Sequence, residues 1–574
     1  MRTKKIIAIA LAAASMTSLL AACKKPGGQV SNDPKVLNVK IYEGGYGTEY
    51  INALKTAFET TFADEGYTLN ILPPRTDLSG TNVYQEIYSN SGVDVYFAGA
   101  KAQDAVYGEY GQCFMDITEV VLNQKAIRYD GTEEDITIGE KIKYDFDTTI
   151  KADDGKFYGI PYAMPVGGIA VNKKELDALG LSLPITTNEF FACADAIMAD
   201  SAAKVAAGQK TWRTALKPFT YALTGNNYVM GVTNCWMSQY GGAEEHAQFW
   251  SFYNESNQPL SVDGTLSGAP SAELADLFYT EKTSKVLEAI FTMYDPNRCV
   301  TNTGSQTFME AQTKLMQGKA VFCPTGDWMF NEMYKSYPNE LNDIVFMKAP
   351  RLSALGVKLY GEGTKYNLSA DKCDQVLKTI ALAVDANKTV AEITAEVATQ
   401  CGVQIDENDV KTAAEARGYI TMTSGDGIFI SEKSTKKDVA VKFLRMCASD
   451  DGGKTFSKNS RTTSPYAPGQ IEETHEWMKN VNKIVTNNYF TQLVSSAKGY
   501  RSAVGVTDMF YQKYYLASAV RSYKYNGKEV SIFDPETLSV VSDQSLYTLA
   551  ANQMAKEIYD DAVTRIANKN WKPM

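Results

Sequence analysis

The stretch VLNVKIYEGGYGTEYINALKTAFETTFADEGYTLNIL (Val36–Leu72) contains two apolar segments with a helical pattern between them. The segments VLNVKIY and YTLNIL are rich in β-branched and aromatic residues, which is typical of buried strands. Between them, apolar residues recur at helical spacing, namely Ile51, Leu54, Phe58 and Phe62. A strand, a helix and a strand in this order predict two parallel strands of one sheet, with ligand-facing loops at their carboxyl ends. We therefore predict an α/β fold.

The same alternation continues along the chain. VDVYFAG (Val93–Gly99) has the pattern of a buried strand, and GKFYGIPYA and GGIAVN within Gly155–Asn172 are strand-like. GIFIS (Gly427–Ser431) precedes the amphipathic segment VAVKFLRMCAS. In PITTNEFFACADAIM, Thr186 and Glu189 have the spacing of a capping box, which predicts that a helix begins there.

The N-terminal segment has the features of a secretory signal. Arg2, Lys4 and Lys5 precede the uncharged stretch Ile6–Leu20, which is too short and too poor in large apolar residues for a membrane-spanning helix. We predict that residues 1–22 are a signal peptide that the mature protein lacks.

LAAC (Leu20–Cys23) resembles the lipobox of bacterial lipoproteins, in which the cysteine receives a lipid before cleavage. The alternative is ordinary cleavage near Ala22, with Cys23 merely next in line. The lipobox interpretation makes Cys23 the lipid-attached N-terminus and residues 23–35 a polar linker, because more than one acyl chain gives stable anchoring. It predicts a protein at the extracellular face of the bacterial cytoplasmic membrane.

Composition excludes several classes of function. The chain has 574 residues, 44% of them apolar and 22% charged, which is enough for two or more globular cores. Without the three basic residues of the signal, 54 basic residues face 67 acidic ones, a net charge of −13. Such a charge argues against nucleic acid and against broad contact with anionic lipid. Apart from Cys23, the cysteines are scattered without any CxxC, and we expect mostly free buried thiols.

Four stretches, in this order, resemble the extracellular solute-binding proteins of ATP-driven importers, specifically the carbohydrate family that includes maltose-binding protein. They are DVYFAGAKAQDAVYGEYGQCFMDITEVV (94–121), DGKFYGIPYAMPVGGIAVNKKELDALGLSLPITTNEFFACADAI (154–197), FMEAQTKLMQGKAVFCPTGDWMFNEM (308–333) and KKDVAVKFLRMCASDDGGKTF (436–456). The second stretch is the strongest match. Each is weak alone, and their order makes the set specific.

The resemblance implies a two-lobed fold of the periplasmic-binding-protein kind (type II), in which each lobe is a mostly parallel sheet flanked by helices. The chain would cross between the lobes more than once. We predict that lobe 1 comprises 36–158 and 424–490, and that lobe 2 comprises 159–423 and 491–574. Two departures stand out, since Asn188 occupies a position where tryptophan is common in the family, and the chain is longer, with the extra length around 341–420.

The GGYG turn lies between the first predicted strand and helix, where free backbone N–H groups can meet hydroxyls or an anion. A plain tight turn is the alternative, and spacing alone does not decide between them. The family uses this loop for its ligand, so the resemblance implies binding roles for Tyr42, Glu43, Gly45 and Tyr46.

Two tryptophans are candidates for ligand contact. Trp328 follows the turn signal PTGD and resembles the sugar-stacking tryptophan of the family, although a buried core tryptophan is the alternative. NCWMSQYGG (Asn234–Gly242) resembles the stretch from which the second lobe contacts ligand, which implies roles for Trp236, Gln239 and Tyr240.

Three further residues are candidates from their positions. Phe97 ends a predicted strand that points toward the ligand, and Tyr162 lies just past a predicted hinge. Arg461 could pair with a carboxylate or with vicinal hydroxyls. A solvated surface arginine is an equally good interpretation of Arg461.

Enzymatic alternatives find little support. The chain has only two histidines, its HEWMK segment lacks the second histidine of HExxH, and GxSxG is missing. No acidic segment fits the calcium-loop pattern. Glycoside hydrolysis needs only two carboxylates, so a lipid-anchored glycoside hydrolase remains the alternative function. We predict a monomeric protein without catalytic residues, metal or cofactor that captures a sugar or oligosaccharide between its lobes and delivers it to an ABC transporter permease.

Overall fold

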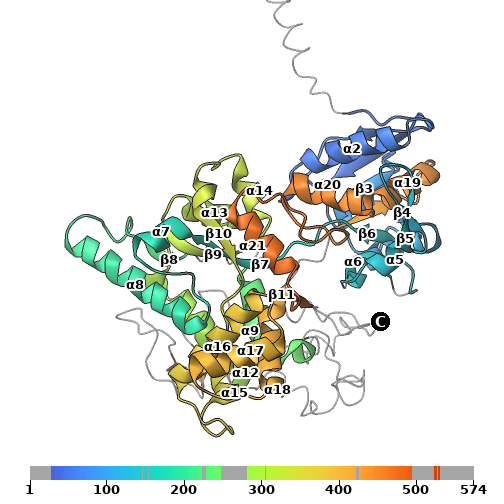
Figure 1. Cartoon of the computed structure of the whole chain (residues 1–574). Helices are drawn as coiled ribbons and strands as arrows, with labels where there is room; N and C mark the ends of the chain where they lie inside the picture. The colour runs from blue at the N-terminus through green and yellow to red at the C-terminus, as the bar shows by residue number, and fades with distance from the viewer. Residues whose placement is uncertain are drawn as a thin grey trace, which may run out of the picture.

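The computed structural model describes residues 28–144, 146–152, 154–222, 228–246, 281–303, 305–421, 426–493, 523–525 and 528–530. The predicted signal peptide and Cys23 therefore lie outside the described residues. The predicted α/β class with two lobes is confirmed, because the helices and strands form two groups, each with its own sheet (Figure 1).

The sheet of lobe 1 has the strand order β2-β1-β3-β12-β6. Its strands are β1 (Val36–Ile41), β2 (Thr68–Ile71), β3 (Val95–Gly99), β6 (Gly159–Pro161) and β12 (Asp426–Ile430). β1 is parallel to both β2 and β3, as the Val36–Leu72 stretch predicts. β12 is antiparallel to β3 and to β6.

The pleat of these strands divides lobe 1 into two apolar layers. Val95 and Phe97 of β3 face one core with α2 (Glu49–Thr61) and α19 (Lys437–Cys447), whereas Tyr96 faces the other core with α3 (Thr81–Tyr88). This alternation follows from the two-residue period of a strand. The remaining elements of lobe 1 are α4 (Ala102–Tyr107), η1 (Thr118–Leu122), β4 (Lys125–Ile127), β5 (Glu133–Thr137), α5 (Ile138–Lys141), α6 (Asp147–Ile150) and α20 (Asp450–Ser460).

The sheet of lobe 2 has the order β10-β7-β9-β8. Its strands are β7 (Gly167–Asn172), β8 (Lys217–Phe219), β9 (Ala320–Gly326) and β10 (Ile344–Met347). β7 is antiparallel to β9 and β10, whereas β8 is parallel to β9, so β7 alone runs against the other three strands of this sheet. β12 is likewise the one reversed strand of the sheet in lobe 1, so both sheets are mostly parallel, as predicted, with one reversed strand each.

Helices cover both faces of the second sheet. They are α7 (Lys173–Ala178), α8 (Thr187–Ala206), α9 (Val229–Gly241), α12 (Glu281–Tyr294), η2 (Pro296–Arg298), α13 (Phe308–Met316), α14 (Met329–Tyr334), η3 (Glu340–Asp343), α15 (Ser353–Tyr360), α16 (Ala370–Asp385), α17 (Val390–Cys401), α18 (Glu407–Gly418) and α21 (Glu476–Val485). α8 begins as predicted, because the Thr186 side chain accepts a hydrogen bond from the backbone N–H of Glu189. The Glu189 carboxylate accepts from the backbone N–H of Ile185 instead of completing the box.

The segment that follows β10 folds as a helical layer. α15, α16, α17 and α18 pack with α9 in the largest apolar cluster of lobe 2, whereas β10 belongs to the sheet itself. Residues 353–418 within the segment 341–420 are thus mostly helical and follow β10, and the expectation that this segment is the extra length stays a prediction. α18 leads into β11 (Tyr419–Thr421), which pairs with β13 (Thr491–Leu493), and a separate antiparallel pair joins β14 (Tyr523–Tyr525) to β15 (Lys528–Val530).

The predicted lobe boundaries differ from the packing at two places. β6 lies in the first sheet, so the chain leaves lobe 1 through residues 162–166. The predicted range 424–490 of lobe 1 includes α21, but this helix packs on β10 of lobe 2. Its apolar face, which includes Trp477 and Val481, supplies the reason, because these side chains complete the second core of lobe 2.

Two further features concern the whole described chain. All eight cysteines other than Cys23 are buried and free, which confirms that expectation. No helix among the described residues combines the length and the apolar character that crossing a bilayer requires.

Candidate functional site

Strand ends from both sheets meet where the chain passes between the lobes. In lobe 1, β3 ends at Gly99 opposite Asp426, the first residue of β12. In lobe 2, β7 begins at Gly167 opposite Gly326, the last residue of β9. Residues 162–166 join the two sheets directly. Loops at these strand ends are therefore the natural place for groups that act between the lobes.

Trp328 lies at this place, pressed against loops of both lobes. A Cβ atom at Gly45 would lie 2.7 Å from the Trp328 Cβ, and a Cβ atom at Gly326 would overlap the indole ring. The Tyr228 ring packs against the indole edge to face, with 5.1 Å between the ring centroids. Only 7% of Trp328 is exposed. Glycine is required at 45 and 326 because a side chain at either position would collide with this ring.

Arg461 completes the contact between the lobes. It follows α20 in the left-handed conformation (φ 57°), and its Nη1 donates to Asn331 Oδ1 at 2.9 Å. Asn331 Nδ2 in turn donates to the Gly45 carbonyl at 3.1 Å, and the Arg461 guanidinium lies 4.1 Å from the centroid of the Tyr334 ring. We refer to Gly45, Trp328, Asn331 and Arg461 as the interlobe junction.

Two carboxyl groups lie on opposite sides of this junction. Asp426 begins β12 in lobe 1, and its Oδ2 accepts a 2.7 Å hydrogen bond from the Tyr46 hydroxyl. Glu332 belongs to α14 in lobe 2 and accepts from Gln312 Nε2 at 2.8 Å. Burial raises the pKa of Asp426 and raises the pKa of Glu332 to about 7. Burial also raises the pKa of the Tyr42 phenol, which both carboxylates raise further, so Tyr42 lies within electrostatic reach of the two.

Asp327, beside Trp328, ties the junction to the crossing segments. Its Oδ1 accepts from the Val166 backbone N–H at 3.1 Å, and its own N–H donates to the Val166 carbonyl. Met164 donates to the Thr463 carbonyl, which joins the first crossing to the segment after α20. Asp327 is wholly buried, and this burial raises its pKa to about 8.

The structure therefore gathers six of the predicted site residues around the junction. Gly45, Trp328 and Arg461 form it, whereas Tyr42 and Tyr46 lie beside it. Glu43 is half-buried in the same loop, and its backbone N–H donates to the Arg75 carbonyl. Their role in ligand binding stays a prediction.

Two other predicted residues, Phe97 and Tyr162, are buried in the apolar core of lobe 1, and their role in ligand binding stays a prediction. Phe97 is fully buried, and its ring packs against Tyr50 and Tyr162. Tyr162 is 3% exposed and belongs to the same apolar cluster. The Phe97 side chain extends into the layer beneath the sheet, because successive side chains of a strand point to opposite faces.

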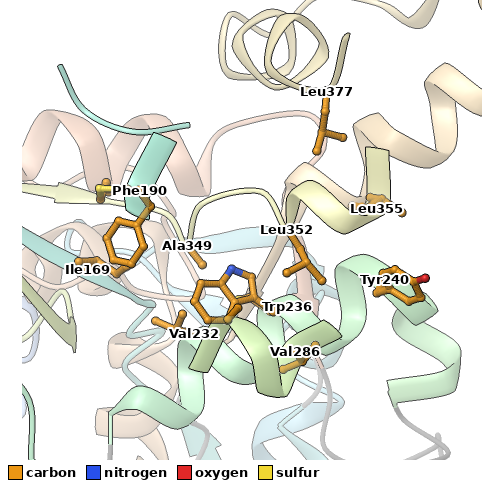
Figure 2. Close-up of a cluster of buried hydrophobic side chains, with 14 of the residues drawn as sticks. Ile169, Phe190, Val232, Trp236, Tyr240, Val286, Ala349, Leu352, Leu355 and Leu377 are labelled. Carbon is orange, nitrogen blue, oxygen red and sulfur yellow. The ribbon is translucent and has the colours of Figure 1, made fainter. Parts of the chain in front are cut away.

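The three predicted residues of α9 are also buried, in the largest apolar cluster of lobe 2, and their role in ligand binding stays a prediction. Figure 2 shows the Trp236 indole among Val232, Ala349 and Leu352. Its Nε1 donates to the Pro350 carbonyl at 2.9 Å, and Gln239 Oε1 accepts from the Leu352 backbone N–H at 2.8 Å. Tyr240 is 5% exposed, with Lys358 Nζ 4.5 Å from its ring centroid. These polar atoms hold α9 to the loop before α15.

Sequence reasoning missed four polar residues that lie in the junction or beside it. They are Asp327, Asn331, Glu332 and Asp426. A signal existed for two of them, because Asp327 and Asp426 each follow a glycine next to a predicted strand. Among the described residues, no three or more His, Cys, Asp or Glu side chains are arranged to hold a metal ion.

Comparisons with solved structures identify similar folds. The chain resembles a chitin oligosaccharide binding protein with a TM-score of 0.51 and 13% identity, over 93% of this chain and 99% of that one. It resembles an ABC substrate-binding protein from Listeria monocytogenes in complex with cycloalternan, with a TM-score of 0.50 and 13% identity, over 94% and 99%. A probable secreted solute-binding lipoprotein from Streptomyces coelicolor gives a TM-score of 0.50 and 11% identity, over 92% and 100%. Such identities show similarity of fold alone.

The sequence itself carries the family assignment. A comparison with curated proteins found no match. Residues 76–454 match the family model of the bacterial extracellular solute-binding protein, which confirms the resemblance seen in the sequence. Because this match spans more than half of the 574 residues, the chain belongs to the family of bacterial extracellular solute-binding proteins.

Proposed function

We propose that this protein captures a sugar or oligosaccharide between its two lobes and delivers it to the permease of an ABC transporter. The observation that carries the proposal is Trp328 at the interlobe junction, within a family of solute-binding proteins. An aromatic face complements the apolar C–H face of a pyranose ring. The similar folds whose descriptions name a chitin oligosaccharide and cycloalternan support the same class of ligand.

The groups around Trp328 suit a hydroxyl-rich ligand. Carboxylates such as Asp426 and Glu332 accept hydrogen bonds from hydroxyls, and the Arg461 guanidinium donates to them. Each such bond adds little net free energy because it replaces a bond to water, whereas stacking on an indole escapes part of this cancellation. We infer that Trp328 supplies most of the affinity and that the polar groups select the sugar.

Ligand entry requires the lobes to separate. Gly45 rests on Trp328, and Asn331 joins the Gly45 carbonyl to Arg461, so the two lobes are in direct contact here. We infer that a sugar reaches the indole when these contacts open and that the lobes close again around it. The ligand then gains affinity to the extent that it binds the closed form better than the open one.

A panel of mono- and oligosaccharides tests the proposal by thermal shift, followed by calorimetry on each sugar that raises the unfolding midpoint. A ligand that binds only the folded state must raise this midpoint. Products are then analysed after incubation with the same sugar. Binding without cleavage supports the proposal, and cleavage above a control without protein favours the alternative, a lipid-anchored glycoside hydrolase.

We propose further that a lipid on Cys23 anchors the protein at the extracellular face of the membrane. The linker ends against lobe 1, where the Ser31 backbone N–H donates to Asn38 Oδ1 and the Ser31 carbonyl accepts from Lys436 Nζ. Cys23→Ala should release the protein from membranes after a salt wash. A variant that stays in the membrane fraction would contradict the anchor.

A further inference from the structure

Lobe 2 contains a cavity of about 190 Å³ outside the interlobe junction. It lies between α21, the segment that precedes α8 and the end of β10. Lys348, which follows β10, and Arg417, near the end of α18, line it together with Asp385 of α16. Lys483 of α21 also lines it, and this side chain is exposed.

The charged groups of this cavity are nearly sealed from solvent. Lys348 is 8% exposed and Arg417 is 6% exposed. They share one carboxylate, because Lys348 Nζ lies 2.6 Å from Asp385 Oδ1 and Arg417 Nη2 lies 2.7 Å from Asp385 Oδ2. These two cations and the positive field around them hold the pKa of Asp385 far below its usual range.

A third buried cation, Arg351, lies close to these groups but does not line the cavity itself. Arg351 is fully buried, and its Nε, Nη1 and Nη2 have no hydrogen-bond acceptor among the described residues. Burial lowers the pKa of Arg351, and the positive charge of Arg417 lowers it further, to about 9. The same two causes lower the pKa of Lys348 to about 8, with a smaller effect from Arg351.

Lys348, Arg417 and Lys483 face a single carboxylate, Asp385, in the cavity lining, which leaves an excess of positive charge there. Buried charges are ordinarily paired, because an unpaired one loses its hydration without compensation. The cavity is more than ten times larger than the roughly 10–15 Å³ that one water needs. Water is neutral, however, and would leave the excess charge uncompensated. A negative group in the cavity would supply both the missing charge and hydrogen-bond acceptors.

We propose that Lys348 and Arg417, with Arg351 close to them, form a binding site for a small oxyanion such as phosphate, sulfate or a short carboxylate. Such anions accept several charge-assisted hydrogen bonds. Arg417 donates from Nε and Nη2 to Asp385 and from Nη1 to the Ala349 carbonyl, so one further N–H on each of Nη1 and Nη2 is left to donate to an anion. Asp385 orients the two cations and keeps them charged. The exposed Lys483 marks the side from which an anion enters. The site is separate from the sugar site proposed above.

Thermal unfolding of the purified protein in phosphate or sulfate tests the site, with chloride at equal ionic strength as the reference. We expect a saturable rise of the unfolding midpoint with phosphate and sulfate, and calorimetry with inorganic phosphate should give a single site. A rise that merely follows ionic strength, or that equals the rise in chloride, would mean an adventitious ion effect and would overturn the proposal.

Variants locate the effect. Lys348→Met keeps the length of the side chain without its charge and should weaken phosphate binding at least tenfold, while Lys348→Arg should retain most of it. Arg417→Met should weaken binding similarly, which provides a second measurement if one variant folds poorly. Lys479→Met is the matched control, because Lys479 is an exposed residue of the same α21 that pairs with Glu476. Unchanged phosphate binding in the folded Lys348→Met variant would overturn the proposal.

Discussion

Helix α9 and the segment that joins β9 to α14 each carry a tryptophan with the same predicted role, yet the two lie in different surroundings. Trp236 of α9 is fully buried, and its indole N–H is satisfied by the Pro350 carbonyl. Trp328 lies between Gly45 of one lobe and Gly326 of the other. Trp236 is held inside one core, whereas Trp328 is covered partly by its own lobe and partly by Gly45 of the other lobe.

The difference shows that low exposure alone does not identify a core residue. Trp328 is only 7% exposed, but part of what covers it belongs to the other lobe and can move away. All contacts of Trp236 in Figure 2 come from within lobe 2. The stability of the fold should therefore depend on Trp236, and the affinity for ligand should depend on Trp328.

The largest effect should come from Trp236→Ala. Truncation leaves a cavity and an unpaired Pro350 carbonyl, so we expect the free energy of unfolding to fall by about 3–5 kcal/mol. Denaturant titration measures this change. Trp212→Ala is the control, because Trp212 is 51% exposed and should cost little. Comparable losses in the two variants would contradict the core position of Trp236.

Trp328→Ala should mainly change binding. We expect sugar affinity to fall by about 2 kcal/mol or more, the scale of a binding hot spot, with a smaller loss of stability than in Trp236→Ala. Calorimetry with a sugar found in the panel and an unfolding midpoint without ligand separate the two quantities. If the variant melts far lower and still binds sugar as tightly as the wild type, Trp328 is a core residue like Trp236.

Asp327, next to Trp328, should make the free energy of unfolding depend on pH. Burial raises its pKa to about 8, so between its ordinary value of 3.8 and this value the folded state holds a proton that the unfolded state has lost. Its contribution to stability is therefore full at low pH and falls as pH rises, by at most about 1.4 kcal/mol per pH unit. Asp327→Asn removes this slope and retains the acceptor for the Val166 N–H. Parallel stability profiles of wild type and variant between pH 4 and 8 would contradict the prediction.

The smallest effect should come from Arg461→Met, which removes the hydrogen bond to Asn331 and the contact with the Tyr334 ring. Partly exposed contacts of this kind contribute below about 1 kcal/mol each. That is enough to increase the open population a few-fold, so small-angle scattering without ligand should give a larger radius of gyration. Arg445→Met is the matched control, because Arg445 donates hydrogen bonds to the Lys125 carbonyl and the Glu133 carboxylate of its own lobe. Equal radii for the two variants would mean that Arg461 does not hold the lobes together.

Much of the fold was predictable because it depends on local patterns. The Val36–Leu72 stretch forms β1, α2 and β2 with the expected parallel pairing. Thr186 caps α8 at the expected residue. The one reversed strand of each sheet, β12 in lobe 1 and β7 in lobe 2, was not predictable, since it depends on how the chain passes between the lobes.

The candidate site was predictable only in part. The loop after β1 and Trp328 lie at strand ends, so their position follows from the topology. The sequence of α9 itself indicates a buried helix, because its residues from 229 to 241 include no charged side chain. A helix without a charged face is typical of a core. Asn331 and Asp426 act only through partners in distant parts of the chain.

The sequence by itself determined the family and several strands and helices of each lobe, and it predicts an N-terminal signal, because these depend on motifs and on hydrophobic period. Only the tertiary structure decided that Trp236 is held within one lobe, that Gly45 contacts Trp328, and that Lys348 and Arg417 share the buried Asp385 carboxylate. The physical reason is that these contacts join residues from separate elements. Their energies depend on distance and burial, which residue spacing along the chain does not specify.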